Sequence, residues 1–154
     1  MCILKIQSAS QSFKAYAEKC TMPIVSVRDA GEVRLKAKGE LWKENGISFD
    51  VSDSEWDNFP GCIDDAIVFL TKHKLELAEL MAIPGITDAY LDFALWSRLD
   101  GNFVTQTDSI PPELVELCGA LRIGIMMSIY DKRFFEEEDE SNKQDKQQEK
   151  DQQP

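Results

Sequence analysis

The sequence has few of the features that identify a catalytic or a metal-binding protein. Among its 154 residues there is one histidine, His73, so neither an H-E-x-x-H zinc motif nor a two-histidine site is available. Its four cysteines never occur as C-x-x-C, and the G-x-G-x-x-G, G-x-x-x-x-G-K-[ST] and G-x-S-x-G motifs are absent. We therefore expect no metal and no cofactor, and the sequence assigns no catalytic residue.

Signals for a membrane or an export route are also missing. No apolar run approaches the roughly 18 to 20 residues of a membrane span. The first ten residues, MCILKIQSAS, lack the basic head, long apolar stretch and small-residue cleavage site of a signal peptide. Widely spaced cysteines without such a signal are expected to be reduced thiols. The sequence therefore predicts a cytoplasmic protein that binds no membrane.

Positive charge is scarce, because the formal net charge is -11. Such a chain repels nucleic acid and anionic lipid surfaces, and its field attracts a basic protein partner instead. From Asp131 onward there are nine acids and five bases, a net -4, which leaves -7 on the preceding residues. Beyond residue 135 nothing is apolar. We expect one domain over residues 1–131 and a disordered tail over residues 132–154, because a segment without apolar groups cannot offset the entropy of ordering.

What the sequence does contain is clear hydrophobic periodicity. Alternation of apolar and polar residues predicts strands, and the most regular alternation lies in residues 121–130, LRIGIMMSIY. Further strands are expected at residues 1–7, 24–27 and 88–99, and a hairpin at residues 33–51 that turns at Asn45-Gly46. Three- and four-residue spacing predicts helices at residues 13–20 and 61–81 and one that opens at Pro111. We expect residues 121–130 and 88–99 to anchor the sheet and residues 1–7 to form a central strand.

The order of these elements predicts the fold class. A β-α-β unit, a hairpin, a long helix and a second β-α-β unit indicate an α+β protein with helices packed on one face of a mainly antiparallel sheet. The nearest named arrangement is the split β-α-β or ferredoxin-like one. Because both ends of the domain read as strand, helix and strand, an internally pseudo-repeated arrangement is the alternative.

Part of the chain resembles a group of small proteins. The segments that carry the resemblance are GELWKENGISFDVSD, followed by a long helix and a strand, and then IPPELVELCGALRIGIMMSIYD. They are similar to small bacterial α+β domains of unknown function in which a proline-led Pro-Glu-Leu helix directly precedes a last strand ending in Tyr. The resemblance covers about residues 39–131. It implies an interaction role, since some members are suspected toxin-immunity or interaction proteins, and it implies no catalytic residue.

An acidic loop before the long helix is one candidate surface for binding a protein. Its candidate residues are Asp53, Glu55, Trp56 and Asp57. Calcium loops also alternate acids, but the Asp-Asn-Phe-Pro that follows Trp56 breaks the pattern of glycine and closing glutamate that calcium requires. A solvated loop is the plainer interpretation. A tryptophan inside an acidic rim is also the composition of a protein-binding hot spot.

The second face of the sheet is the other candidate surface. Where the apolar rows of residues 88–99 and 121–130 face the core, the opposite rows present aromatic, charged and flexible side chains: Tyr90, Asp92, Trp96, Arg98, Arg122, Met126 and Tyr130. Aromatic residues interleaved with charges are typical of a recognition surface. The alternative is that the hairpin or a second copy of the chain covers this face, so a homo-oligomer stays open.

These observations favour a non-enzymatic interaction protein of immunity or adaptor type that binds a basic protein partner. Two alternatives stand beside it. One is a small-molecule sensor, and the other is an enzyme with an unrecognised site around His73, with Glu76 three residues on and a reactive cysteine. The enzyme alternative requires a thiol of depressed pKa.

Overall fold

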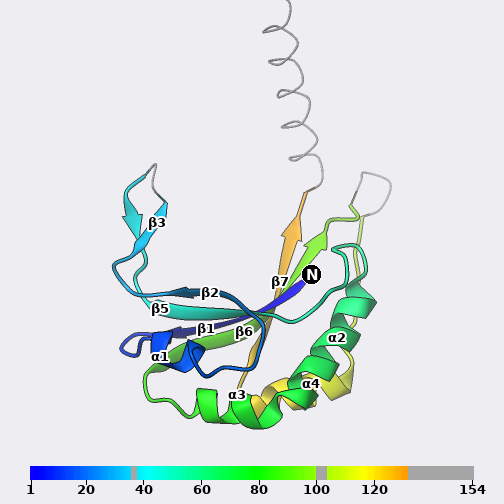
Figure 1. Ribbon diagram of the computed structural model, residues 1–154. Coiled ribbons are helices and arrows are strands. Elements are labelled where there is room, and N and C mark those ends of the chain that lie inside the picture. Colours follow the sequence, from blue (N-terminus) through cyan, green and yellow to red (C-terminus); the bar gives the residue numbers. More distant parts are fainter. Residues whose placement is uncertain (36–37, 100–103, 132–154) are drawn as a thin grey trace, which may run out of the picture. The chain divides into compact units, whose positions relative to one another are not determined.

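The computed structural model describes residues 1–35, 38–99 and 104–131 (Figure 1). These residues fall into two compact units. The larger unit joins Met1–Leu95 with Asp108–Ser128 and holds the helices and most of the sheet. The smaller unit contains Trp96–Thr107 and the segment that begins at Ile129. The expectation of one domain over residues 1–131 stays a prediction. The predicted disordered tail, residues 132–154, lies outside the described residues.

The described residues form seven strands and four helices. The strands are β1 (Cys2–Ser8), β2 (Ile24–Arg28), β3 (Val33–Leu35), β4 (Glu40–Leu41), β5 (Asn45–Asp50), β6 (Ile86–Trp96) and β7 (Gly124–Tyr130). The helices are α1 (Lys14–Ala17), α2 (Phe59–Lys72), α3 (Lys74–Met81) and α4 (Pro112–Leu121). The fold is therefore α+β, as the sequence predicts.

Five of the strands make one sheet in the order β2-β5-β1-β6-β7. β1 lies in the centre, as the sequence predicts, and pairs antiparallel with both β5 and β6. β2 also pairs antiparallel with β5, so β5 separates two strands that run the same way. β1, α1 and β2 thus form a split β-α-β unit, which confirms the predicted arrangement.

The last strand departs from the antiparallel pattern. β7 lies next to β6, and the two arrows point the same way in Figure 1. Parallel neighbours require a crossover connection, and here α4 lies within it. This second β-α-β unit has no strand between its two strands, so the two ends of the chain differ in topology despite their similar element order.

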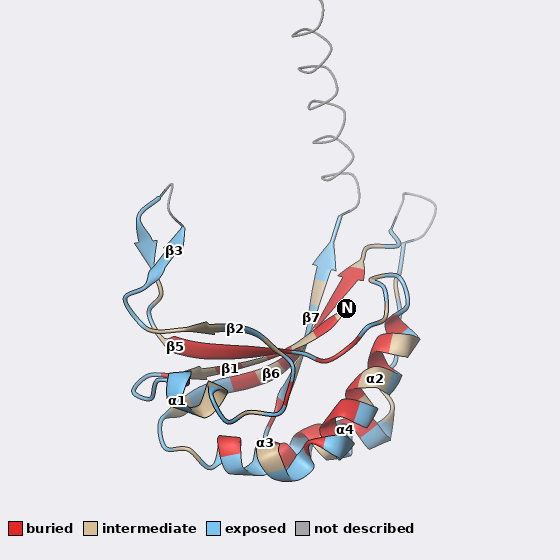
Figure 2. Ribbon diagram, in the orientation of Figure 1, coloured by how far each residue is buried: buried red, intermediate tan, exposed pale blue. Residues whose placement is uncertain are grey.

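The core lies between one face of the sheet and the helices. Along β1, Cys2, Leu4 and Ile6 are fully buried, and the residues between them are only half-buried. The antiparallel register places Leu4 opposite both Phe49 of β5 and Leu91 of β6, which are also fully buried. Figure 2 shows buried residues along these strands and on the inner sides of the helices. The predicted packing of helices on one face of the sheet is confirmed.

The predicted bounds of the long helix and of the last strand are wrong. The helix expected over residues 61–81 is broken at His73, whose backbone (φ -102°, ψ 16°) ends α2 and precedes α3. The strand expected from residue 121 begins at Gly124, because α4 continues to Leu121 and Arg122 caps it in the left-handed region at φ 57°. Arg122 therefore does not join the row of Met126 and Tyr130 on the strand.

The predicted hairpin over residues 33–51 is also wrong. β3 pairs with the two-residue β4 in a small separate hairpin, and β5 enters the main sheet. Asn45-Gly46 is not a turn but the first two residues of β5.

Among the described residues, no helix is both long and apolar enough to cross a membrane.

The central position of β1 predicts a steep difference between two leucine substitutions. Leu91→Ala removes a fully buried side chain that faces β1, so we expect it to lower the free energy of unfolding by about 2 to 5 kcal/mol. Leu75→Ala is the matched control on α3, where Leu75 is 82% exposed. It should change the free energy of unfolding by no more than about 0.5 kcal/mol. Urea denaturation measures both; equal losses would contradict this assignment of the core.

Candidate functional site

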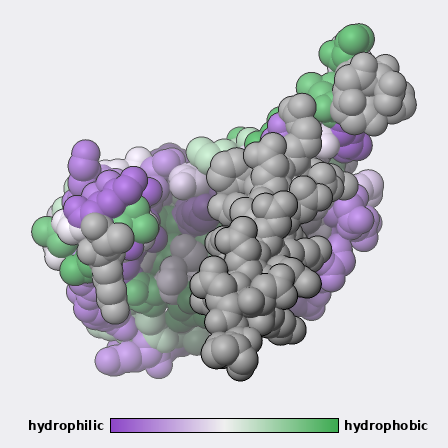
Figure 3. Space-filling view, turned by 90° about the horizontal axis from the view of Figure 1, so that it is seen from above, coloured by the Kyte–Doolittle hydropathy of each residue, from purple (hydrophilic) through white to green (hydrophobic). Residues whose placement is uncertain are grey.

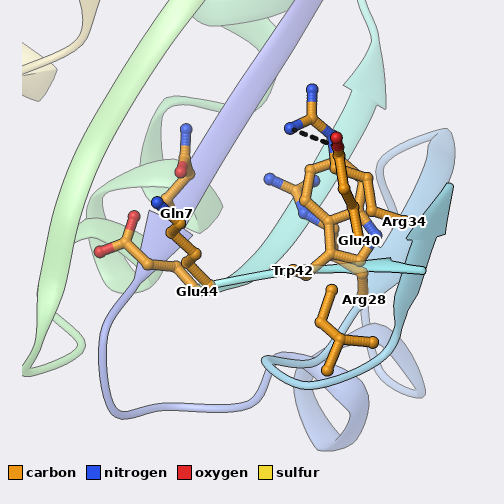
Figure 4. Close-up of a pocket in the computed structure, with 8 residues that line it drawn as sticks. Gln7, Arg28, Arg34, Glu40, Trp42 and Glu44 are labelled. Atoms are coloured by element: carbon orange, nitrogen blue, oxygen red, sulfur yellow. Dashed lines mark ion pairs between the residues drawn. The ribbon is translucent and has the colours of Figure 1, made fainter. Parts of the chain in front are cut away.

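A cleft of about 540 Å³ opens beside the β3–β4 hairpin (Figure 4). Its volume lies within the range of small-molecule sites. Residues of β1, β2, the hairpin and the segment leading into β5 line it: Gln7, Arg28, Arg34, Glu40, Leu41, Trp42, Lys43 and Glu44. Gln7 pairs with Gly46 and Gly46 pairs with Arg28, so these three residues form one row across the sheet. Because Ile6 and Ile47 face the core, this row lies on the opposite face of the sheet from the helices.

The absence of a side chain at Gly46 makes room for Arg28. A Cβ atom built on Gly46 would lie 2.4 Å from Cζ and 2.6 and 2.7 Å from the two terminal nitrogens of the Arg28 guanidinium. These nearly equal distances place Gly46 over the face of the guanidinium rather than at its edge. Glycine within a strand often marks such a close approach.

Trp42 provides an aromatic surface for two arginines. Cζ of Arg28 lies 4.1 Å from the ring centroid of Trp42 and that of Arg34 lies 5.2 Å from it, which are cation–π distances. The backbone of Trp42 is fixed by hydrogen bonds with its own N–H donating to Glu32 O (2.9 Å) and with Gly31 N–H donating to Trp42 O (2.8 Å). These bonds fix the backbone from which the indole projects.

The charges in the cleft are only partly balanced. Arg34 makes a long ion pair with Glu40, at 3.8 Å, and both side chains are exposed. Within the described residues the Arg28 guanidinium has no hydrogen bond or ion pair, and its buried Nε lacks a partner. The sequence does not reveal this cleft, because Asn45-Gly46 is typical of a turn and gives no sign that the glycine makes room for Arg28.

The predicted acidic loop lies elsewhere, directly before α2. Asp53, Glu55 and Asp57 are exposed and Trp56 is half-buried. The start of the loop is tied to α2 by Asp65, whose Oδ2 accepts hydrogen bonds from the hydroxyls of Ser52 (2.7 Å) and Ser54 (2.8 Å). These two hydroxyls, Ser52 foremost, hold the pKa of the Asp65 carboxyl below its usual range.

Tyr90 and Asp92 lie together on the face of β6 opposite the core. Asp92 accepts an ion-paired hydrogen bond from Lys5 of β1 at 2.5 Å and a hydrogen bond from the Ser128 hydroxyl at 2.6 Å. Nζ of Lys5 also lies 5.9 Å from the centre of the Tyr90 ring. The structure therefore brings these two predicted residues together, and Asp92 connects three neighbouring strands.

Trp96, Arg98 and Tyr130 belong to the smaller unit. The rings of Trp96 and Tyr130 meet edge to face with centroids 6.3 Å apart, and Ser97 N–H donates to Tyr130 O at 2.7 Å. The Arg98 guanidinium donates to Thr107 O at 3.3 Å. Apart from Arg122 and Met126, the predicted surface residues thus form three groups: the acidic loop, the Tyr90–Asp92 pair, and this aromatic cluster with Arg98.

His73 lies at the break between α2 and α3. Its side chain is 9% exposed, its ring centroid lies 4.8 Å from that of Phe69, and its Nδ1 lies 3.7 Å from Oε2 of Glu76. Burial raises the pKa of the Glu76 carboxyl, but hydrogen bonds from the hydroxyl and N–H of Thr21 outweigh it and hold that pKa below its usual range. Glu76 therefore connects α3 to Thr21, which precedes β2.

The four cysteines are free thiols, and three of them are buried. Burial raises the pKa of Cys2 far above its usual value and that of Cys118 to about 11. Burial also raises the pKa of Cys20, which is half-buried. An activated thiolate requires the opposite shift, so the pKa shifts of these three thiols do not favour the enzyme alternative.

Within the described ranges, no group of three or more His, Cys, Asp or Glu side chains is placed to hold a metal ion. Comparison with protein-family models, curated proteins and solved structures finds no match for the chain. The function must therefore be argued from the chain's own surfaces.

The hydrogen bonds to Asp65 predict an acid-dependent contribution to stability. Because the folded-state pKa lies below the unfolded value of about 3.9, the contribution is complete above about pH 4 and is lost as the pH falls through the folded pKa. We expect Asp65→Asn to lower the free energy of unfolding by about 1 to 2 kcal/mol at pH 7, and by less at pH 3. Asp64→Asn, at the exposed neighbouring position, is the control. The stabilising role of Asp65 would be contradicted if both variants lost the same free energy of unfolding at pH 7. It would also be contradicted if Asp65→Asn lost as much at pH 3 as at pH 7.

Thiol alkylation provides a separate check on the core. With iodoacetamide at neutral pH we expect Cys20 to react first, because Cys2, Cys62 and Cys118 are at most 3% exposed and must wait for the chain to open. Mass spectrometry of partially alkylated protein identifies the order. Rapid modification of Cys2 or Cys118 in the folded chain would refute the burial described above and revive the enzyme alternative.

Proposed function

We propose that this protein is a non-enzymatic interaction protein, of adaptor or immunity type, that binds a protein partner along β7 and the adjoining face of the sheet. The observation that supports this proposal is the composition of β7. An edge strand presents unpaired backbone groups, and most proteins protect such edges with charges, prolines or bulges. The seven residues of β7, GIMMSIY, contain no charge and no proline.

The side chains of β7 are apolar and accessible. Met126 is 44% and Met127 is 45% exposed, and in an extended strand they point to opposite faces of the sheet. The other edge of the sheet differs, because β2 has five residues, a register shift after Ile24 and a charged end at Arg28. A partner that adds a strand to β7 would gain backbone hydrogen bonds and bury both methionines.

Charge favours a basic partner. The 131-residue stretch before the tail is net acidic, and complementary charge accelerates association and excludes partners of like sign. The acidic loop with Trp56 and the Tyr90–Asp92 pair supply the charged and aromatic groups of the predicted interaction surface. An immunity or adaptor protein of this kind acts by occlusion, so it needs no catalytic group.

The test is affinity capture with charge-insertion variants. Met126→Lys places a charge on the open edge, and Leu75→Lys places the same charge at an exposed position on α3. We expect the wild-type chain and Leu75→Lys to capture one stoichiometric basic protein that is released at high salt. Met126→Lys should capture at least tenfold less of that protein.

Equal capture by Met126→Lys and Leu75→Lys would exclude β7 as the binding edge. In that case Trp56→Ala decides whether the acidic loop binds the partner instead. Failure of the wild-type chain to retain any protein at low salt would contradict the proposed function itself.

A further inference from the structure

We propose that the cleft around Arg28 and Trp42 is a binding site for a small ligand that carries one carboxylate or phosphate group. This site is separate from β7 and does not depend on the proposed partner. Figure 4 shows Arg28 and Arg34 meeting at Trp42, with Gln7 and Glu44 across from them. Seen from above in Figure 3, hydrophilic and hydrophobic side chains lie next to each other at the left, and the hairpin contributes the exposed Val33, Leu35 and Leu41.

The first argument is the incomplete hydrogen bonding of Arg28. A guanidinium has five N–H donors, and buried or half-buried charges are normally paired because an unpaired one is costly. Arg28 is half-buried, yet the described residues offer it neither a hydrogen-bond acceptor nor a carboxylate, although the chain as a whole is strongly acidic. An anion in the cleft would supply the missing acceptor.

The second argument is the orientation of the guanidinium. One of its faces lies against Gly46, and the Trp42 ring is at stacking distance. The N–H bonds of a guanidinium point outward in its plane. Because Gly46 and Trp42 contact the faces, the edges are available to an acceptor that lies in this plane. Carboxylates and phosphates bind such an edge with two parallel hydrogen bonds. The guanidinium is therefore pre-oriented for an anion rather than placed at random on the surface.

The third argument concerns the size and charge of the ligand. The lining contains three cations and two carboxylates, so the cleft balances roughly one negative charge. A polyanion such as nucleic acid would meet Glu40 and Glu44 and the net charge of the chain. A volume of about 540 Å³ suits a small molecule, and the Gln7 side chain adds an amide that can donate or accept a hydrogen bond.

Nuclear magnetic resonance of the full chain tests this proposal. Inorganic phosphate and acetate are titrated separately at constant ionic strength, with chloride as the reference, while the Trp42 indole N–H and Arg28 Nε–H signals are followed. The indole signal is assigned with Trp42→Phe. We expect a saturable shift of both signals with half-saturation on the order of millimolar. Response to phosphate alone, or to acetate alone, identifies which of the two anions the site takes.

Three variants distinguish the site from general screening. Arg28→Gln should weaken the response at least tenfold, and Lys74→Gln, which removes an exposed positive charge outside the cleft, should leave it unchanged. Gly46→Ala keeps Arg28 but forces its flexible end away from the strand, so it should weaken binding even if Arg28→Gln fails to fold. No saturable shift beyond the chloride reference, or an unchanged response in Gly46→Ala and any folded Arg28→Gln, would overturn the proposal.

Discussion

The antiparallel pairing of β1 with β5 and β6 is the contact on which the rest of the structure depends. These three strands are distant in sequence, and each contributes fully buried side chains to the core, such as Leu4, Phe49 and Leu91. A one-residue slip of β5 would turn Ile47 and Phe49 away from the helices, so the core fixes the register of the strand. The helices then pack on the face that this register makes apolar.

The same register determines what lies on the opposite face. Once Ile47 and Phe49 face the core, Gly46 must face away from it, beside Gln7 and Arg28. The space over Gly46 admits the Arg28 guanidinium, and the hairpin places Trp42 against it. Core packing therefore determines where Gln7, Gly46 and Arg28 lie, and the hairpin and the segment after it supply the other lining residues of the cleft.

The sequence predicted the fold class and the central position of β1, although β1 is fully buried on one face alone and carries Lys5 and Gln7 on the other. It failed where one pattern has two structural meanings. Residues 121–130 alternate as a core strand does, but β7 is an edge strand and its alternating Met127 is 45% exposed. Asn45-Gly46 is a common turn pair, yet here the glycine makes room for the guanidinium of Arg28, which lies 18 positions earlier in the sequence. Such long-range contacts have no local signature.

Together these features describe a small α+β protein whose central strands are well protected and whose last strand is open. Amide hydrogen exchange of the free, monomeric chain tests that description most directly, residue by residue. The account predicts that the amides of β1 exchange only on global unfolding. The outward-facing amides of residues 124–128 in β7, which have no strand partner among the described residues, should exchange orders of magnitude faster. Equal protection of β1 and of all β7 amides would show that this edge is already covered and would contradict its role as the binding edge.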